Sequence, residues 1–329
     1  MEKDGAGSYV LGLVARCVRS LLAPVRVIRY KSLYPLTFRM DRAFDIEVYA
    51  HDENVLRGHP NPLNRRGKKV FSQNEEDGIT YEIIRRLGIR TGVFAEFGVG
   101  DGLENNTVVL ALLGWKGFWV GGQKLIVNLP PEPEAGQQRQ FAYLRRFVNR
   151  DNIVAFAKKG LELISETEVD VISLDLDGND VYFVEELLGH GFLPKLFIVE
   201  YNAKFMPPIR WKMAYNGNHI WDEDDYFGGS LMEFNDLFER FGYLLVCCNA
   251  VTGSNAFFVH SSCRQAFCDI PQDINLLWVA PRYHPVKCGH PVSPRTVSQI
   301  LADIASVRRE RERECHAEAV MSSGVRSSG

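Results

Sequence analysis

The sequence predicts an α/β fold in which a mostly parallel sheet carries helices on both faces and ends in an antiparallel hairpin. Short apolar runs such as GVFAEFG (92–98) alternate with stretches of helical spacing from about residue 70 to residue 242. That alternation is typical of parallel sheets. Two further apolar runs lie within YLLVCCNAVTGSNAFFVH (243–260), joined by a loop rich in Gly, Ser and Asn. This pattern predicts the hairpin.

The elements follow one another in a regular order. Ser72 stands three residues before Glu75, a capping-box spacing that predicts a helix start, and isoleucines at helical spacing follow. Predicted strands cover residues 92–98, 117–122, 141–148, 169–178 and 195–202, and predicted helices cover residues 105–114, 151–164, 180–191 and 230–242. Connected in this way, the strands form one sheet whose carboxyl ends share an edge, where such folds bind ligands.

Composition limits the class of protein. The chain has 329 residues, of which 46% are hydrophobic and 24% charged, with a formal net charge of -3. This balance predicts a globular protein with a full core and gives no reason to expect a nucleic-acid partner. The cysteines are odd in number, seven, and none has C-x-x-C spacing. We therefore expect no disulfide framework or zinc site, and a cytoplasmic location.

Three regions are expected along the chain. Residues 1–69 form an N-terminal arm and irregular connector, residues 70–262 the α/β domain, and residues 263–329 an extension with a helix and a charged, Ser-rich tail. The arm carries an apolar helical stripe interrupted by Arg16 and Arg19. Its apolar run is too short to span a bilayer, so the arm lies on the inner face of a membrane as a peripheral amphipathic helix, packs on the domain as a helix, or is loosely ordered.

A glycine-rich turn follows the first strand. In FAEFGVGDGLENNT (94–107), Glu96 closes the apolar run and Gly98, Gly100 and Gly102 follow at alternate positions. Glycines at such a strand end let the backbone approach a ligand closely. A dinucleotide fingerprint counted from Gly98 requires glycine at position 103, where Leu103 stands, so the turn does not predict NAD.

The turn resembles motif I of the class I S-adenosylmethionine-dependent methyltransferases, acidic-x-Gly-x-Gly-x-Gly. Six segments, from FSQNEEDGI (71–79) through ISLDLDGNDVYFVEELL (172–188) to YFGGSLMEFNDLFERFGYLLV (226–246), are similar in order to proteins related to the FkbM-type methyltransferases, which are associated with polysaccharide modification. The resemblance implies a Rossmann-like methyltransferase sheet and S-adenosyl-L-methionine as cofactor. It implies these cofactor-binding positions: Glu96, Gly98, Gly100, Gly102, Asn106 and Gly121.

Gly121 departs from this pattern. Relatives are expected to place an acidic residue just after the second strand, where its carboxylate accepts hydrogen bonds from the ribose hydroxyls; here Gly121 occupies that position. A hydrogen bond to a charged group contributes about 1.5 to 3 kcal/mol, or roughly one to two decades of affinity. The departure therefore keeps a second hypothesis open, a non-catalytic binding or scaffolding protein that retains the fold.

Acidic side chains gather at two later strand ends. Asp175 and Asp177 flank Leu176 at the end of one strand, and Glu200 and Asn202 end the next. Adjacent carboxylates and an amide form an all-oxygen set that suits Mg²⁺, and small-molecule O-methyltransferases of this fold use a comparable arrangement. The other interpretation is that Asp180 caps a helix and the remaining residues are solvated.

The segment YNGNHIWDEDDYFGGS (215–230) mixes rings, acids and amides, as saccharide sites do. His219 is a candidate general base, unless it simply packs in a folded loop. Together these patterns predict an O-methyltransferase acting on a hydroxyl of a sugar or related polar metabolite. Its catalytic residues are expected to be Asp175, Asp177 and His219.

Overall fold

The computed structural model describes residues 50–134, 136–282 and 289–303. The chain divides into two compact units, Met1–Asn54 and Val55–Gly329, and the elements described below belong to the second. The predictions for the amphipathic arm and for the tail after Val307 lie outside the described residues. In the part of the chain that is described, no helix combines the length and apolarity needed to cross a membrane.

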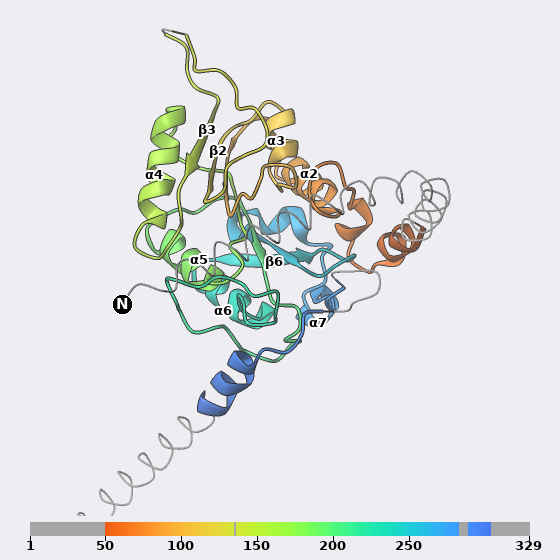
Figure 1. Ribbon diagram of the computed structural model, residues 1–329. Coiled ribbons are helices and arrows are strands. Elements are labelled where there is room, and N and C mark those ends of the chain that lie inside the picture. Colours follow the sequence, from red (N-terminus) through yellow and green to blue (C-terminus); the bar gives the residue numbers. More distant parts are fainter. Residues whose placement is uncertain (1–49, 135, 283–288, 304–329) are drawn as a thin grey trace, which may run out of the picture. The chain divides into compact units, whose positions relative to one another are not determined.

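Seven strands form one sheet in the order β3-β2-β1-β4-β5-β7-β6. Their bounds are β1 Val93–Phe97, β2 Lys116–Gly121, β3 Phe141–Arg145, β4 Val171–Leu174, β5 Leu196–Glu200, β6 Tyr243–Cys248 and β7 Asn255–His260. The first five strands pair in parallel, and β7 runs antiparallel to both of its neighbours. The predicted parallel sheet and its closing hairpin are confirmed (Figure 1).

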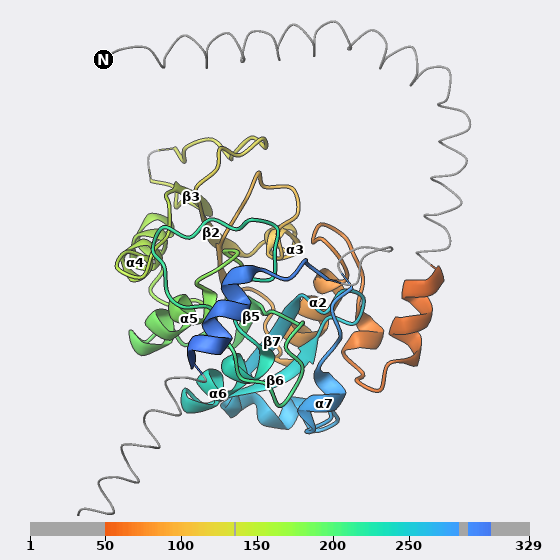
Figure 2. The same ribbon diagram turned by 60° about the horizontal axis from the view of Figure 1, so that its bottom comes forward.

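Helices cover both faces of the sheet, as predicted. The elements are η1 Asn64–Arg66, α2 Glu76–Arg86, α3 Val108–Leu112, α4 Ile153–Ile164, α5 Asp180–Gly189, α6 Leu231–Arg240, η2 Ser261–Phe267 and α7 Ile274–Leu277. One core cluster joins α4, α5 and α6 to the sheet, and a second joins α2, α3 and α7 (Figures 1 and 2). Side chains alternate between the clusters along β1, where Phe94 enters one and Ala95 the other, because successive strand residues face opposite ways.

The start of α2 differs from the prediction. The helix begins at Glu76, and Ser72 does not cap it. Instead, Asp77 Oδ2 accepts hydrogen bonds from the amides of Val70, Phe71 and Ser72 at 2.6–2.8 Å and from Ser72 Oγ at 2.8 Å. The carboxylate collects donors of the preceding turn, which a single capping serine cannot satisfy. The chain therefore turns for four residues before the helix starts.

The connector before α2 packs on the far edge of the sheet. Asn61 Nδ2 donates to the carbonyl of Val246 at 2.7 Å, and Asn64 Nδ2 donates to that of Cys248 at 2.7 Å. Both asparagines are fully buried. Residues 61–63 are irregular, as the sequence predicts, whereas residues 64–66 form η1, and both parts are tied to β6.

Candidate cofactor and acceptor site

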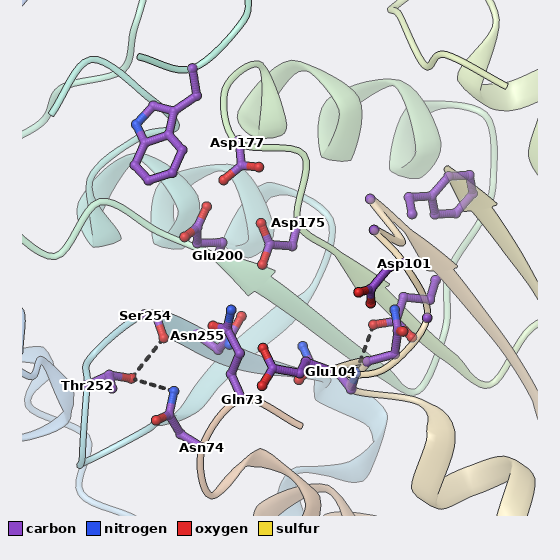
Figure 3. A pocket seen from close by; sticks show the side chains of 18 of the residues that line it. Gln73, Asn74, Asp101, Glu104, Asp175, Asp177, Glu200, Thr252, Ser254 and Asn255 are labelled. Atoms are coloured by element: carbon purple, nitrogen blue, oxygen red, sulfur yellow. Dashed lines mark hydrogen bonds between the residues drawn. The ribbon is translucent and has the colours of Figure 1, made fainter. Parts of the chain in front are cut away.

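A cavity of about 520 Å³ opens where the strands β1, β4 and β5 end. This is the edge at which doubly wound sheets bind ligands, where the chain order switches from β1 outward to β4. Figure 3 shows the carboxyl groups of Asp175, Asp177 and Glu200 pointing toward one another on one side, with amide and hydroxyl side chains opposite. The lining comprises Gln73, Asn74, Glu96, Phe97, Gly98, Gly100, Asp101, Gly102, Glu104, Asn105, Asn106, Asp175, Asp177, Glu200, Trp221, Thr252, Ser254, Asn255 and His290.

The glycine turn forms one wall of this cavity. Gly98 has φ of +98°, and a Cβ built on it would lie 1.4 Å from the carbonyl oxygen of Asp175. Only glycine fits between the ends of β1 and β4, for both steric and conformational reasons. Gly100 and Gly102 also line the cavity, so the structure brings all three predicted glycines to one surface.

Glu96 lies buried at the base of the turn. Its Oε1 accepts a hydrogen bond from the amide of Asn106 at 2.8 Å, and its Oε2 accepts from the amide and hydroxyl of Thr107 at 3.2 and 2.5 Å. Burial raises the pKa of Glu96 to about 7, although these bonds act in the opposite direction. The carboxylate therefore joins β1 to the start of α3 and still faces the cavity.

Three carboxyl groups, hereafter the triad, line the cavity at the ends of β4 and β5. One oxygen each of Asp175, Asp177 and Glu200 lies within 4.8 Å of the others. Withdrawal from solvent raises the pKa of Asp175 and of Glu200 well above their usual ranges, and the neighbouring carboxylates add to it. Partial withdrawal of its carboxyl group from solvent also raises the pKa of Asp177, although the residue as a whole is exposed.

Asp180 holds the turn that presents the triad. Its two oxygens accept from the amides of Leu176 and Gly178, each at 2.8 Å. Burial raises the pKa of Asp180 to about 6 against the effect of these bonds. Asp177 takes a left-handed φ of +53° in the same turn. The predicted structural role of Asp180 beside a helix start is thus present together with the triad, not in place of it.

The ionisable side chains that line the cavity are predominantly acidic. Six carboxyl side chains line it, namely those of Glu96, Asp101, Glu104, Asp175, Asp177 and Glu200. No Lys or Arg is among its lining residues in the described part of the chain. Such a cavity favours ligands that carry positive charge or many hydroxyl donors, and it disfavours anions.

Three sequence predictions need correction. His219 does not line the cavity: its ring fills the space beside Gly178, where a Cβ would lie 2.4 Å from its Cδ2. Asn202 does not line it either, because its Nδ2 donates to the carbonyls of Asp225 and Phe227 at 2.9 and 3.1 Å. Its Oδ1, the atom that would bind a metal ion, accepts from the amide of Lys204 at 3.3 Å, so the whole amide group of Asn202 holds the following loop.

Gly121 is the third correction. It is absent from the cavity lining, and a Cβ on it would lie 2.1 Å from the carbonyl oxygen of Val99. The backbone of the glycine turn thus occupies the space into which a ribose-binding carboxylate would project. An acidic residue cannot be restored at Gly121 without moving that turn.

Several lining residues were missed by the sequence reading. Gln73 and Asn74 come from the turn before α2, and Thr252, Ser254 and Asn255 come from the β6–β7 loop. Buried Glu76 links the two, since its Oε1 accepts from Asn249 Nδ2 at 3.0 Å and from Asn255 Nδ2 at 3.1 Å. The adjacent acidic residues of QNEED (73–77) were the feature of the sequence that could have indicated this part of the site. Their hydrogen-bond partners lie more than 170 residues away along the chain, so the sequence pattern does not identify them.

The segment after residue 288 supplies the last wall. His290 lines the cavity and packs edge-to-face on Trp221, with ring centroids 4.9 Å apart. Buried Asp225 anchors the segment by accepting from the amide of Ser293 and the hydroxyl of Thr296, both at 2.7 Å. Arg295 lies near Asp222 and Asp224 at 3.2 Å. The extension, expected to lie outside the functional domain, therefore takes part in the site.

No family model matches the chain, and no curated protein matches it. Among solved structures it is similar to a fibrillarin/Nop5p complex, with 12% identity over 59% of this chain and 88% of that one, at a TM-score of 0.30. A 1,6-didemethyltoxoflavin-N1-methyltransferase from Burkholderia thailandensis, with bound S-adenosylhomocysteine, has 14% identity over 69% and 87% of the two chains, at a TM-score of 0.31. CalO1, a methyltransferase of calicheamicin biosynthesis in its SAH-bound form, has 14% identity over 55% and 54%, at a TM-score of 0.30.

At these identities and TM-scores the neighbours do not assign a function. The fold is established by the strand order itself, in which β7 lies antiparallel between β5 and β6. This is the Rossmann-like sheet of the class I methyltransferases that the resemblance implied. The narrower likeness to FkbM-type proteins has no matching family model and stays a prediction.

Proposed function

We propose that this protein is an S-adenosylmethionine-dependent O-methyltransferase acting on a hydroxyl of a sugar or related polar metabolite. One observation carries the proposal: the glycine turn with Glu96 opens into the same cavity as the triad. A cofactor held at the turn would thus have its reactive end beside a second, polar compartment. The proposal has two parts: the cofactor and the class of reaction, and then the saccharide nature of the acceptor.

The acidic lining fits a cofactor that is itself cationic. S-adenosylmethionine, when bound, supplies an electrophilic methyl group on a sulfonium centre and carries an α-ammonium group. Glu96, ionised, is placed to accept from that ammonium group, while Gly98 and Gly100 allow the backbone to approach. The ribose carboxylate expected at Gly121 is missing, and besides Glu96 the glycine turn places the acidic side chains of Asp101 and Glu104 in the cavity.

The acceptor would lie between the triad and the wall of Trp221 and His290. In the transfer, the methyl carbon–sulfur bond breaks, a carbon–oxygen bond forms, sulfur keeps the electron pair and the hydroxyl proton goes to a base. His290 replaces His219 as the proposed proton acceptor, because it lines the cavity and has a reference pKa near neutrality. The aromatic wall and the carboxylates suit a ring that bears hydroxyl groups.

Tritium transfer tests the proposal. The full chain is incubated with S-adenosyl-[methyl-³H]methionine and a panel of free sugars and methyl glycosides, and the labelled product is separated. We expect label in at least one glycoside. Asp177→Asn should remove that label while leaving the affinity for S-adenosylhomocysteine within a few-fold, since Asp177 lies across the cavity from Glu96.

The two histidines provide a matched pair. His290→Gln should lower the transfer rate by about 10²-fold or more, the usual contribution of a general base, whereas His219→Gln should change it less than threefold. The pH dependence of the residual rate separates proton transfer from mere packing, because loss of a base removes its ionisation from the profile. A larger loss in His219→Gln than in His290→Gln would contradict the assignment.

Mg²⁺, predicted from the sequence, is not required by the chemistry, because a sulfonium methyl group transfers without a Lewis acid. Whether Mg²⁺ binds depends on which ligand atoms face the cavity, and Asn202, predicted from the sequence as a ligand, does not face it. The non-catalytic alternative predicts a different binding result. A scaffold with a closed cofactor site would bind neither S-adenosylmethionine nor its demethylated product.

A further inference from the structure

The triad has a fourth neighbour that the sequence did not indicate. Asn255 is the residue paired with Glu200 across β5 and β7, and it lines the same cavity. Its side chain is only 6% exposed, and its Nδ2 donates to Glu76 Oε1 at 3.1 Å. Its Oδ1, however, has no hydrogen-bond partner. Buried amide oxygens are normally satisfied, so this one indicates a missing ligand.

We propose that Asp175, Asp177, Glu200 and the Oδ1 of Asn255 bind a hard divalent cation. The site is made of oxygen atoms alone, from three carboxyl groups and one amide. Mg²⁺, Mn²⁺ and Ca²⁺ prefer such donors, whereas Zn²⁺ prefers histidine and cysteine, neither of which belongs to the triad. The ligand set differs from the one predicted from sequence by exchanging Asn202 for Asn255.

The spacing of the oxygens fits this class of ion. Two ligands on opposite sides of an ion are separated by twice the bond length, which is about 4.2 Å for Mg²⁺ and roughly 4.6 to 5.2 Å for Ca²⁺. The triad oxygens lie within 4.8 Å of one another. Separations up to this limit are in the range that one ion of this class requires of the three carboxyl oxygens.

The surroundings leave the triad without another source of positive charge. In the described part of the chain no amide, hydroxyl, Lys or Arg donates to its oxygens, and no Lys or Arg lines the cavity. Crowded carboxylates in this situation attract a cation when one is present. Glu76, which accepts from Nδ2 of Asn255, fixes the amide so that Oδ1 is the free end.

Binding of the ion does not depend on the proposed function, although its use does. If the protein transfers methyl groups to a saccharide, the ion would hold the acceptor hydroxyl beside the triad and favour its deprotonation. The ion and the cofactor would be held by different side chains of one cavity, the triad with Asn255 for the ion and Glu96 for the cofactor. Their binding can therefore be measured separately.

Mn²⁺ alone tests the site on the full chain, by calorimetry in a chelator-free buffer. We expect one Mn²⁺ per chain, with affinity at least tenfold weaker in Asp177→Asn and in Glu200→Gln. Asp101→Asn is the matched control, since Asp101 lines the cavity outside the triad, and it should change the affinity less than twofold. Asp177 is exposed, so its variant remains informative if Glu200→Gln fails to fold.

Terbium luminescence gives an independent readout. Trp221 lines the same cavity, so excitation of tryptophan should sensitise bound Tb³⁺, and Trp221→Phe should lower that emission without lowering Mn²⁺ affinity. No Mn²⁺ binding by the wild-type chain, or equal binding by the wild-type chain and both triad variants, would overturn the inference. Binding of S-adenosylhomocysteine in that case would leave the methyltransferase proposal standing, and the reverse result would leave the metal site standing.

Discussion

Three carboxyl groups at the start of α2 accept hydrogen bonds from neighbouring amides and hydroxyls, whereas in the described chain no such group donates to the three at the ends of β4 and β5. Asp77 accepts four hydrogen bonds through one oxygen, and Glu76 accepts from Asn74, Asn249 and Asn255. Glu75 accepts from the amide of Val251 at 2.9 Å. The triad of Asp175, Asp177 and Glu200 receives no such bond within the described chain.

The contrast separates structural acids from acids available to a ligand. Glu75, Glu76 and Asp77, hereafter the α2 cluster, are each no more than 3% exposed and tie the turn before α2 to the β6–β7 loop. The cluster thereby positions Asn74, Thr252 and Asn255 around the cavity. The triad faces the cavity with its oxygens unused, so mutations in the two groups should have opposite consequences for stability and for binding.

The largest effect is expected for Asp77→Ala. The substitution removes an acceptor shared by four hydrogen bonds and leaves three backbone amides without a partner. At about 1 kcal/mol or more for each bond, the free energy of unfolding should fall by about 3 to 5 kcal/mol. Urea denaturation measures this. A loss below about 1 kcal/mol would show that the α2 cluster does not hold the fold.

A second expectation is a pH-dependent stability from Glu75. Burial first and the neighbouring Glu76 second raise the pKa of Glu75 to about 8 in the folded chain, above the ordinary value of 4.5. A raised pKa favours the protonated form, so its contribution is complete below about pH 4.5 and is lost as pH rises through about 8. Between pH 5 and pH 8, Glu75→Gln should lose less stability than the wild-type chain, by about 3 to 4 kcal/mol.

Denaturation curves at several pH values measure the difference. The surface variant Glu168→Gln serves as the control, because Glu168 is exposed. Parallel pH profiles for the wild-type chain and Glu75→Gln would contradict the ionisation of Glu75 as the cause.

Glu96 should give a smaller effect, seen in binding. Its pKa of about 7 means that ionisation is completed between pH 6 and pH 8. If the carboxylate accepts from the cofactor ammonium, affinity for S-adenosylhomocysteine should rise by up to about tenfold over that interval, because the ionised fraction rises about tenfold. Titrations of Glu96→Gln should be weaker and nearly independent of pH. A pH dependence retained in Glu96→Gln would assign it to another group.

The smallest effect on stability is expected for Asp177→Asn. Asp177 is exposed, receives no hydrogen bond and has a left-handed φ of +53°, a conformation that asparagine tolerates well. The free energy of unfolding should change by no more than about 0.5 kcal/mol. Because the substitution removes one of three neighbouring carboxylates, we expect this change to be an increase. A loss above about 1.5 kcal/mol would place Asp177 with the structural acids of the α2 cluster.

Local patterns were sufficient for the fold. Apolar runs, glycine turns and helical spacing lie within short windows, so they predicted the strands β1 to β5, the helices between them and the closing hairpin. The same locality explains why Glu96, the three glycines and the triad lie at one edge of the sheet. Residues that end neighbouring parallel strands meet there whatever their distance along the chain.

The errors arose where contacts join distant segments. The His219 ring packs closely against Gly178 and does not line the cavity. The Asn202 side chain donates hydrogen bonds to the carbonyls of Asp225 and Phe227 instead of facing the cavity. Asn255 and His290 enter the site through the β5–β7 register and the anchoring of residues 290–296 on Asp225. No periodicity carries such information. The obstruction at Gly121 likewise depends on the path of the Val99 backbone.

Calorimetric titration of the full chain with S-adenosylhomocysteine, beside a titration with NAD, tests the central claim most directly. The account predicts one site for S-adenosylhomocysteine, weakened tenfold or more in Glu96→Ala, and no heat with NAD. The control Asp177→Asn should bind within a few-fold of the wild-type chain. Silence with both ligands would contradict the cofactor assignment and favour a scaffold, and binding of NAD alone would contradict the interpretation of the glycine turn.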